Sequence, residues 1–585
     1  MTMKKSGRTM IKRYAGVVAF GFLSATSLWA QNSYDTMKNL ASSRDYDNAA
    51  KYASTVIREN AKNHDALVLA GDVFAEVDKL DSAIIAYRKA KEVKDNAVVS
   101  RKLSYALAQT GNAAEAVTIM RDAVKRDAKD VNNQLALADA LVIVNPDDTK
   151  EAELIITKVK NANPKLAEPY VALGNVYYAQ KVYELAQMNY EQALSVDPTL
   201  LDARMKLANA YYRMANAETD RQLGNQYFTR SLEEWNAVTR QDPMNSRAFF
   251  EQGKILYLAG QHLDAARTFY EFLRLRPEGD NKLGRWYLAQ SLHTLGACDS
   301  AAPQLVIVAR ELDSVSVKAQ SMLAECYFNQ RNFTAAAREY KALKDKNMLP
   351  LSEMERYGAA VFNTGDTLGS IPIYRELLNA DPSQCKLMLQ FGYLLRGRKM
   401  YSEAIDVFKK RIASCPDSLN GRLYYLIGAS YFSDNKVPEA IAALQQGIAT
   451  EPASLPFYTL LGEIYLDAKN NTEAEKQFLK TIELGKGNPA NTNDVDNSYR
   501  QLAVMHYGAK NYKKVGEYAK QWIEFNPENA NGYFFAGLAA DLTKDYKTAT
   551  KYYNETLKRD PSNKTASDRI SAIKNASVGA GNGKN

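Results

Sequence analysis

Small and large apolar residues recur along this chain with a regular helical spacing. In seven segments a glycine is followed twelve positions later by an alanine, and an apolar or aromatic residue such as Tyr87 or Tyr190 comes four positions after that. The alanine position recurs along the chain at steps of mostly 33 to 36 residues. These repeat-defining pairs are Gly71 and Ala83, Gly174 and Ala186, Gly253 and Ala265, Gly392 and Ala404, Gly428 and Ala440, Gly462 and Ala474, and Gly537 and Ala549.

The spacing predicts a pair of antiparallel helices in every repeat. Small residues are needed where the two helix axes lie closest, and a large residue four positions further on fills the wider gap on the same face. Proline often follows, as at Pro198 and Pro243, and ends the second helix because it cannot continue the hydrogen-bond ladder. A period of this length, repeated over the whole chain, indicates a solenoid.

The best-defined repeat carries the residues of a known family. It contains Tyr170, Leu173, Gly174, Tyr177, Ala186, Tyr190, Ala193 and Pro198. They match the tetratricopeptide repeat (TPR) pattern at every diagnostic position except the tryptophan, which Tyr170 replaces. The chain therefore resembles the TPR family over about residues 31–563. The resemblance implies an all-α fold, a right-handed α-α superhelical solenoid of about fifteen helix hairpins with a C-terminal capping helix.

The array predicts a simple domain organisation. We expect a signal peptide over residues 1–30, repeats 1 to 13 over 31–484, and a loop rich in Gly, Asn and Pro over 485–495. Repeats 14 and 15 follow over 496–563, then a capping helix over 564–577 and a disordered tail over 578–585.

The first residues have the composition of an export signal. Five basic residues precede a largely apolar run from Tyr14 to Leu28, which is short for a membrane span. We expect the signal peptide to be cleaved after Ala30. Cleavage after Ser27 and an uncleaved N-terminal anchor are the two alternatives. The sequence therefore predicts an exported, periplasmic protein.

Charge and composition exclude several function classes. The net charge of +8 includes the five basic residues of the signal, so the chain without them carries +3 and lacks the basic footprint of a nucleic-acid protein. A hydrophobic share of 46% with 24% charged residues excludes wholesale disorder. No phosphate-binding loop, zinc motif or nucleophile elbow occurs, and the four histidines lie in four different repeats. We expect no enzymatic activity, no cofactor and no metal.

The TPR resemblance implies that the first helix of each hairpin lines a concave groove. Position four after the conserved glycine is expected to face that groove, and it is aromatic in most repeats. The candidate partner-binding residues are therefore Tyr178, Tyr212, Tyr257, Phe328, Phe362, Phe432 and Tyr507. Tyr and Phe offer large apolar area with few rotatable bonds, so they are good anchors for an extended ligand. The alternative is that these rings are core residues packed between neighbouring first helices.

These features predict an exported scaffold for protein–protein interaction. Its partner would be another protein or a peptide segment held in an aromatic groove by shape and apolar burial, in assembly or secretion at the cell envelope. An accessory protein of a polysaccharide export or modification complex is the alternative, because rows of tyrosine also stack on sugar rings.

Cysteine positions add a structural prediction. Cys385 and Cys415 lie at the start of one repeat's first helix and near the end of its second, and antiparallel helices bring these ends together. A Cys385–Cys415 disulfide is therefore plausible in an oxidising compartment, as is a looser Cys298–Cys326 pair. Free buried thiols remain the alternative.

Overall fold

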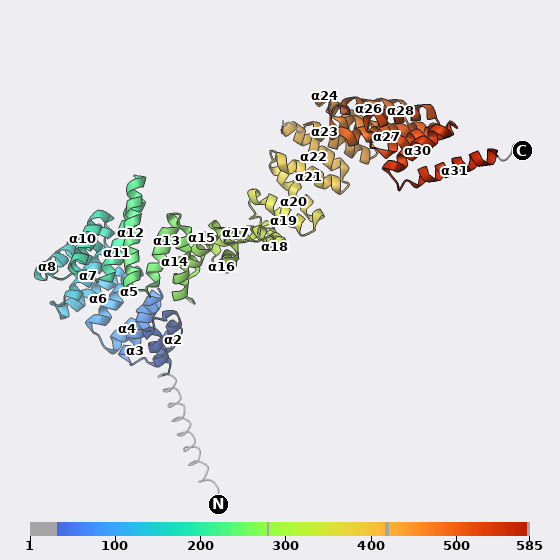
Figure 1. Ribbon diagram of the computed structural model, residues 1–585. Helices are drawn as coiled ribbons and strands as arrows, with labels where there is room; N and C mark the ends of the chain where they lie inside the picture. The colour runs from blue at the N-terminus through green and yellow to red at the C-terminus, as the bar shows by residue number, and fades with distance from the viewer. Residues whose placement is uncertain (1–31, 278–279, 416–419, 582–585) are drawn as a thin grey trace, which may run out of the picture. The chain divides into compact units, whose positions relative to one another are not determined.

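The computed structural model describes residues 32–277, 280–415 and 420–581 (Figure 1). The predicted signal peptide over residues 1–30 lies outside this range. The chain divides into two compact units, Met1–Leu349 and Pro350–Asn585. The described residues contain helices and no strand.

The described residues of the first unit form nine helix hairpins. In chain order its helices are 32–42 and α2 (Tyr46–Glu59), α3 (His64–Glu76) and α4 (Leu80–Val93), α5 (Ala97–Gln109) and α6 (Ala113–Arg126), α7 (Val131–Val144) and α8 (Lys150–Ala162), α9 (Glu168–Ala179) and α10 (Tyr183–Val196), α11 (Leu201–Ala217) and α12 (Arg221–Gln241), α13 (Ser246–Leu258) and α14 (His262–Leu275), α15 (Lys282–Thr294) and α16 (Cys298–Glu311), and, after a 3₁₀ turn at Asp313–Val315, α17 (Ser316–Asn329) and α18 (Phe333–Asp345).

In the second unit, the part of the chain that the structure describes forms six hairpins and a final helix. A 3₁₀ turn at Leu351–Glu353 precedes α19 (Met354–Asn363) and α20 (Thr367–Ala380), followed by α21 (Cys385–Gly397) and α22 (Tyr401–Ser414), α23 (Asn420–Ser433) and α24 (Val437–Thr450), α25 (Leu455–Asp467) and α26 (Asn471–Gly485), a 3₁₀ turn at Pro489–Asn491, α27 (Thr492–Gly508) and α28 (Tyr512–Phe525), α29 (Ala530–Leu542) and α30 (Tyr546–Arg559), and α31 (Lys564–Gly581). Nine and six hairpins confirm the fifteen that the sequence predicts.

The repeat-defining residues pack as the spacing predicts. Ala186 of α10 is fully buried, and Tyr190 one turn later is 1% exposed. A Cβ added to Gly174 of α9 would lie 2.4 Å from Cε1 of Tyr190, a distance that real Cβ atoms do not reach. Glycine is therefore required here because the tyrosine ring lies directly against the backbone of the first helix.

First helices form the inner face of each unit. Among the described residues, neighbouring first helices contact one another directly, for example α5 with α7, α7 with α9, and α25 with α27. Second helices of neighbouring hairpins approach one another much less closely. Since the first helices lie closer together than the second helices, each unit curves toward its first-helix side, which we call the inner face.

Curvature in the first unit brings its first hairpin against its sixth and seventh. Arg276, next to the end of α14, donates from Nε to Asp47 Oδ2 at 2.9 Å and from Nη2 to Asp47 Oδ1 at 3.0 Å. Arg44, just before α2, pairs with Asp242 at the end of α12 at 2.5 Å. Residues about 200 positions apart are thus neighbours, and α2 lies near α14 (Figure 1).

Two predicted boundaries are wrong. The loop expected over 485–495 is shorter, since α26 continues to Gly485 and α27 begins at Thr492 rather than near Asp496. Val495 is fully buried, and this burial holds the first turn of α27 in place. The final helix extends to Gly581, four residues into the tail that was expected to be disordered; residues 582–585 lie outside the described range.

The predicted capping helix covers the end of the array. Ala566, Ile570 and Ile573 of α31 are buried against Ala549 and Tyr553 of α30. In the part of the chain that the structure describes, no helix has both the length and the hydropathy of a membrane span.

Candidate partner-binding surface

The seven predicted aromatic residues lie at the ends of first helices. Six of them occupy the last residue but one of their helix, whereas Tyr212 lies further from the end of the lengthened α11. Those in the first unit are Tyr178, Tyr212, Tyr257 and Phe328, and those in the second are Phe362, Phe432 and Tyr507. Each unit therefore presents an aromatic edge where its inner face meets the turns of its hairpins.

None of these seven rings is buried. Phe362 is 43% exposed, Tyr507 is 44% exposed, and the other five are half-buried. Most fully buried rings belong instead to the second helices, with Tyr190 and Phe408 as examples, although Phe457 of α25 and Tyr499 of α27 are buried in first helices. Each predicted ring is therefore partly packed on the protein and partly open to solvent.

Several of the rings contact a second ring five residues further on, across the turn of the hairpin. The partner lies at the first residue of the second helix. These pairs, with the distances between their ring centroids, are Tyr178–Tyr183 at 5.4 Å, Tyr257–His262 at 5.5 Å, Phe328–Phe333 at 5.6 Å and Tyr507–Tyr512 at 6.3 Å. These second rings were not among the predicted residues, although their constant spacing of five residues is visible in the sequence.

Polar contacts hold the tyrosines of the first unit in position. Arg213 of α11 donates from Nε to the Tyr178 hydroxyl at 3.1 Å, and Tyr257 donates to Gln290 Oε1 of α15 at 3.1 Å. The ammonium group of Lys254 lies 5.1 Å from the centroid of Tyr212. Each contact joins one hairpin to the next, so the rings are held in a fixed orientation.

The side chain one position after the conserved glycine accepts a hydrogen bond from a tyrosine of the same repeat. The hydroxyl group of the buried Tyr87 donates a hydrogen bond to Asp72 Oδ1 at 2.8 Å, and the hydroxyl group of Tyr190 donates one to Asn175 Oδ1 at 3.0 Å. Desolvation, followed by the charges of Asp72 and Glu76, raises the pKa of Tyr87 far above its usual value, so the hydroxyl stays protonated and donates. These acceptors are already used within the fold.

Cations on the inner face of the first unit have partners of their own. Lys102 lies 2.6 Å from Asp72, Lys206 lies 2.8 Å from Asp202, and Lys254 pairs with Glu251. His293 Nε2 lies 3.3 Å from Glu325 Oε2. The three lysine charges are thus compensated locally, whereas Arg213 on the same face contacts the neutral Tyr178 hydroxyl.

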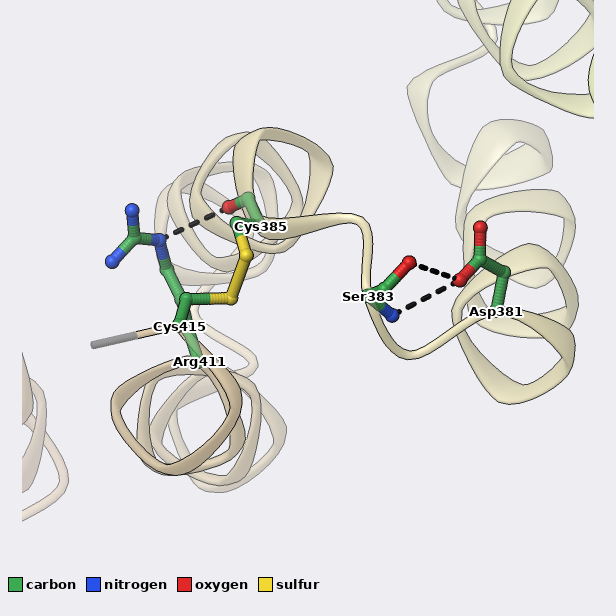
Figure 2. Close-up of a disulfide and its surroundings, with 5 residues drawn as sticks. All are labelled: Asp381, Ser383, Cys385, Arg411 and Cys415. Atoms are coloured by element: carbon green, nitrogen blue, oxygen red, sulfur yellow. Dashed lines mark hydrogen bonds between the residues drawn. A yellow bond between two sulfur atoms is a disulfide. The ribbon is translucent and has the colours of Figure 1, made fainter. Parts of the chain in front are cut away.

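Both predicted cysteine pairs are disulfides in the structure. Cys385 at the start of α21 is bonded to Cys415 at the end of α22, with Cα atoms 6.0 Å apart. Figure 2 shows this bond beside Arg411, which is 3% exposed and donates from Nε to the Cys385 carbonyl at 3.0 Å. Cys298 of α16 is bonded to Cys326 of α17, which joins two consecutive hairpins. All four cysteines of the chain lie in the described ranges, and none of them is free.

No cluster of potential metal ligands occurs within the described ranges. The histidines lie in separate hairpins, as the sequence indicates, and each has local contacts: His64 Nδ1, for example, lies 3.0 Å from the Ala90 carbonyl oxygen.

Comparisons with known proteins identify the repeats. The family model described as TPR repeat matches residues 174–214, and the model described as tetratricopeptide repeat matches residues 24–98, 214–280 and 425–489. The chain is a multi-repeat tetratricopeptide protein, and TPR arrays of this kind serve as scaffolds for protein–protein interaction.

Individual relatives are distant. Human protein O-mannosyl-transferase TMTC1 is 24% identical over 229 residues, 39% of this chain and 25% of that protein. Human DnaJ homolog subfamily C member 7 is 22% identical over 442 residues, 66% of this chain and 85% of that protein. The chain thus spans about a quarter of the length of TMTC1. The transferase activity in that name belongs to TMTC1.

Solved structures include similar chains. The crystal structure of a thermophilic TPR protein of Thermus thermophilus shares 21% identity, covers 33% of this chain and 98% of its own, and has a TM-score of 0.26.

Proposed function

We propose that this protein is an exported TPR scaffold that holds a partner protein against the aromatic edge of its inner face, in assembly or secretion at the cell envelope. The observation that carries this proposal is the arrangement of the predicted rings. They are half-buried or exposed, they lie at equivalent positions of successive first helices, and neighbouring side chains fix their orientation.

Such an edge is suited to an extended or helical segment. Rigid aromatic rings lose little rotamer entropy on binding, so each contributes apolar contact at low cost. Successive first helices repeat the same position, so a segment along the edge meets one ring in most repeats. The paired charges of the first unit favour binding by shape and apolar burial.

Export is supported by the cysteines and by the composition of the N-terminus. All four cysteines are paired, and disulfides of this kind persist in oxidising compartments outside the cytoplasm. The basic and apolar segment at residues 4–28 matches an export signal. No catalytic role is part of this proposal.

A triple substitution tests the aromatic edge. Replacing Tyr178, Tyr212 and Tyr257 by alanine should abolish crosslinked capture of the envelope partner while the helical content measured by circular dichroism is retained. Since the rings are only half-buried, we expect about 1 to 2 kcal/mol of lost stability per ring, below the cost of a fully buried ring.

The control removes three exposed tyrosines from second helices. Tyr52, Tyr270 and Tyr546 are 39%, 44% and 46% exposed, and their replacement by alanine should leave capture intact. Equal capture by both triple variants would contradict the aromatic edge. Binding to glycan arrays with no binding to peptide arrays would contradict a protein partner.

A further inference from the structure

Two consecutive hairpin turns near the end of the second unit carry lysines in the same pattern. The turn between α27 and α28 contains Lys510, and Lys513 follows at the second residue of α28. The turn between α29 and α30 contains Lys544, and Lys547 follows at the second residue of α30. All four residues are exposed. Because the two hairpins are consecutive repeats of the same form, the four lysines lie along one edge of the unit, which we call the basic edge.

The same backbone hydrogen bonds hold both turns. In each turn the residue after the lysine donates its N–H to the carbonyl oxygen five positions earlier, at 2.9 Å from Asn511 and at 2.8 Å from Asp545. This bond is typical of a Schellman motif, in which Lys510 and Lys544 take the left-handed position with φ of 56° and 65°. The two turns are thus built alike and present their lysines at equivalent places on the surface.

Lys513 and Lys547 depart from the pattern of the other repeats. Among the described turns, no other one with a basic residue at the left-handed position has a second basic residue three positions later. That later residue is Asp47, Glu184, Thr334, Ser402 or Thr472. Most second helices also carry an acid in their first turn, as α4 does with Asp81 and α26 with Glu473, because the helix dipole favours an acid there and disfavours a lysine. Departures from a local preference of this kind are expected at functional sites.

The basic edge lacks matching negative charge. In the part of the chain that the structure describes, none of its four lysines forms an ion pair, whereas the neighbouring Lys514 lies 2.7 Å from Glu475. Asp545 lies in the second turn and caps α30, so it is the one carboxylate between the lysines. One helical turn beyond the edge, the charges of Glu517 and Lys551 offset each other. The edge therefore keeps a net positive charge.

Apolar side chains accompany the lysines. Leu542, the last residue of α29, is 37% exposed and precedes Lys544 by two positions. Tyr507 is 44% exposed and precedes Lys510 by three positions. Exposed tyrosine and lysine side chains of this kind are typical of membrane interfaces, where the ring lies at the level of the headgroups and the flexible lysine reaches the phosphates.

We propose that the basic edge binds the phosphate headgroups of an anionic membrane surface, with Leu542 and Tyr507 in the interface beside the lysines. Lysine is a flexible point charge that needs no fixed geometry, and the edge has no arginine to orient a single ligand. Exposed lysines beside apolar side chains therefore favour a fluid anionic surface over one acidic chain. This inference goes beyond the proposed capture of a partner, because it places the scaffold itself on the membrane.

Vesicles test the inference on the full chain as isolated from cell envelopes. Cosedimentation compares vesicles of phosphatidylcholine alone with vesicles that also contain about 30% phosphatidylglycerol, at about 50 mM and about 300 mM salt. We expect the anionic vesicles to bind at least about tenfold more tightly than the neutral ones, and added salt to weaken this binding, because salt screens exposed charges. Equal binding to both kinds of vesicle would overturn the inference.

Two sets of lysine substitutions locate the contact. Each lysine near an anionic surface is worth about fivefold in binding, so glutamine at all four positions of the basic edge should weaken binding to anionic vesicles by at least about a hundredfold. The control removes the same charge from four exposed lysines of the first unit that form no ion pair in the described chain, and it should change nothing. These control positions are Lys62, Lys129, Lys158 and Lys165. Undiminished binding by the first set, or an equal loss with both sets, would contradict the proposed contact.

An environment-sensitive dye shows which part of the protein meets the lipid. All four native cysteines are paired, so Ala509→Cys and Ala128→Cys each supply a single thiol for labelling. Ala509 adjoins Lys510, whereas Ala128 lies between α6 and α7 of the first unit. The dye at position 509 should brighten on anionic vesicles and the dye at position 128 should not. Binding through the apolar N-terminal segment alone would brighten neither dye and would overturn the inference.

Soluble polyanions separate a lipid surface from an acidic polymer. Polygalacturonate or polyglutamate that binds through the four lysines, while anionic vesicles do not bind, would reject the membrane contact. The vesicle assays contain no partner protein, so their failure would reject this contact alone and leave partner capture by the aromatic edge standing.

Discussion

At the scale of single residues, the position of the conserved glycine shows how little space separates the two helices of a hairpin. Alanine is a better helix former than glycine by about 1 kcal/mol, so propensity alone favours replacing it. At Gly174, however, the new methyl group would lie 2.4 Å from the buried ring of Tyr190. Packing therefore decides whether replacing Gly174 by alanine stabilises or destabilises the protein.

We expect Gly174→Ala to destabilise the first unit by about 1 to 3 kcal/mol, the usual cost of overpacking a core. Gly397 ends helix α21 with nothing within 4 Å of an added Cβ, so Gly397→Ala is the matched control and should be neutral or slightly stabilising. Urea denaturation followed by circular dichroism measures both. Destabilisation by the two changes alike would contradict the packing argument.

The surroundings of His506 lead to a prediction about how stability depends on pH. Its side chain is 9% exposed, its ring stacks on Tyr518 with centroids 5.6 Å apart, and its Nε2 lies 3.3 Å from Glu475 Oε1. Burial lowers the pKa of His506 below its usual value of 6.5, while the charge of Glu475 opposes that change and the charge of Lys514 adds to it. The unfolded chain therefore binds a proton here more readily than the folded chain does.

The sign of the pH effect follows from this difference in proton affinity. A histidine with a lowered pKa contributes stability above its unfolded pKa, and that stability is lost as the pH falls from the unfolded pKa through the lower folded pKa. We therefore expect the second unit to lose stability as the pH falls below about 6.5, and His506→Gln to remove part of that loss. Thermal melts at a series of pH values measure the effect; an unchanged pH slope in the variant would contradict it.

At the scale of elements, the two disulfides join helices in different ways. Cys385–Cys415 closes one hairpin by linking the start of α21 to the end of α22. Cys298–Cys326 links the second helix of one hairpin to the first helix of the next. Each bond removes freedom from the unfolded chain over a separation of about 30 residues.

Replacing Cys385 and Cys415 together by serine should lower the stability of the second unit by about 2 to 4 kcal/mol, the usual range for a loop of this length. Mass mapping without reduction should find no free thiol in the unaltered protein, and thermal melting measures the loss. Alkylation of Cys385 and Cys415 without prior reduction would reject the bond. Equal melting temperatures with and without a reductant would contradict its contribution.

At the scale of the whole array, the first unit is held by contacts between hairpins far apart in the chain. The Arg276–Asp47 pair is bidentate, and its side chains are only 15% and 10% exposed. Nearest-neighbour contacts describe most of a solenoid, but this pair adds a long-range contact that limits how far the first unit opens.

Arg276→Gln leaves a largely buried carboxylate without its charged partner, so we expect a loss of about 3 kcal/mol or more. Hydrogen exchange in α2 and α14 should accelerate together. Arg88→Gln breaks the exposed pair with Glu115 and is the control, with an expected loss below about 1 kcal/mol. Faster exchange in α14 alone would show that the two hairpins are not coupled.

The fold itself could be predicted because its information is local. The positions of Gly174, Ala186 and Tyr190 repeat with a constant period, and short-range packing within a hairpin requires that pattern. The same period located the first helices and their aromatic residues. It also placed Cys385 opposite Cys415, because the ends of two antiparallel helices meet whatever surrounds them.

Other features required the tertiary structure. The sequence left open whether the aromatic row is core or surface, because half-burial depends on the angle between hairpins, which no local pattern encodes. The sequence placed the start of α27 too late, because Val495 is held by packing that turn-forming residues do not reveal. The pairing of Arg276 with Asp47 had no sequence signal. It results from small rotations summed over many repeats, so only the folded array determines which distant side chains meet.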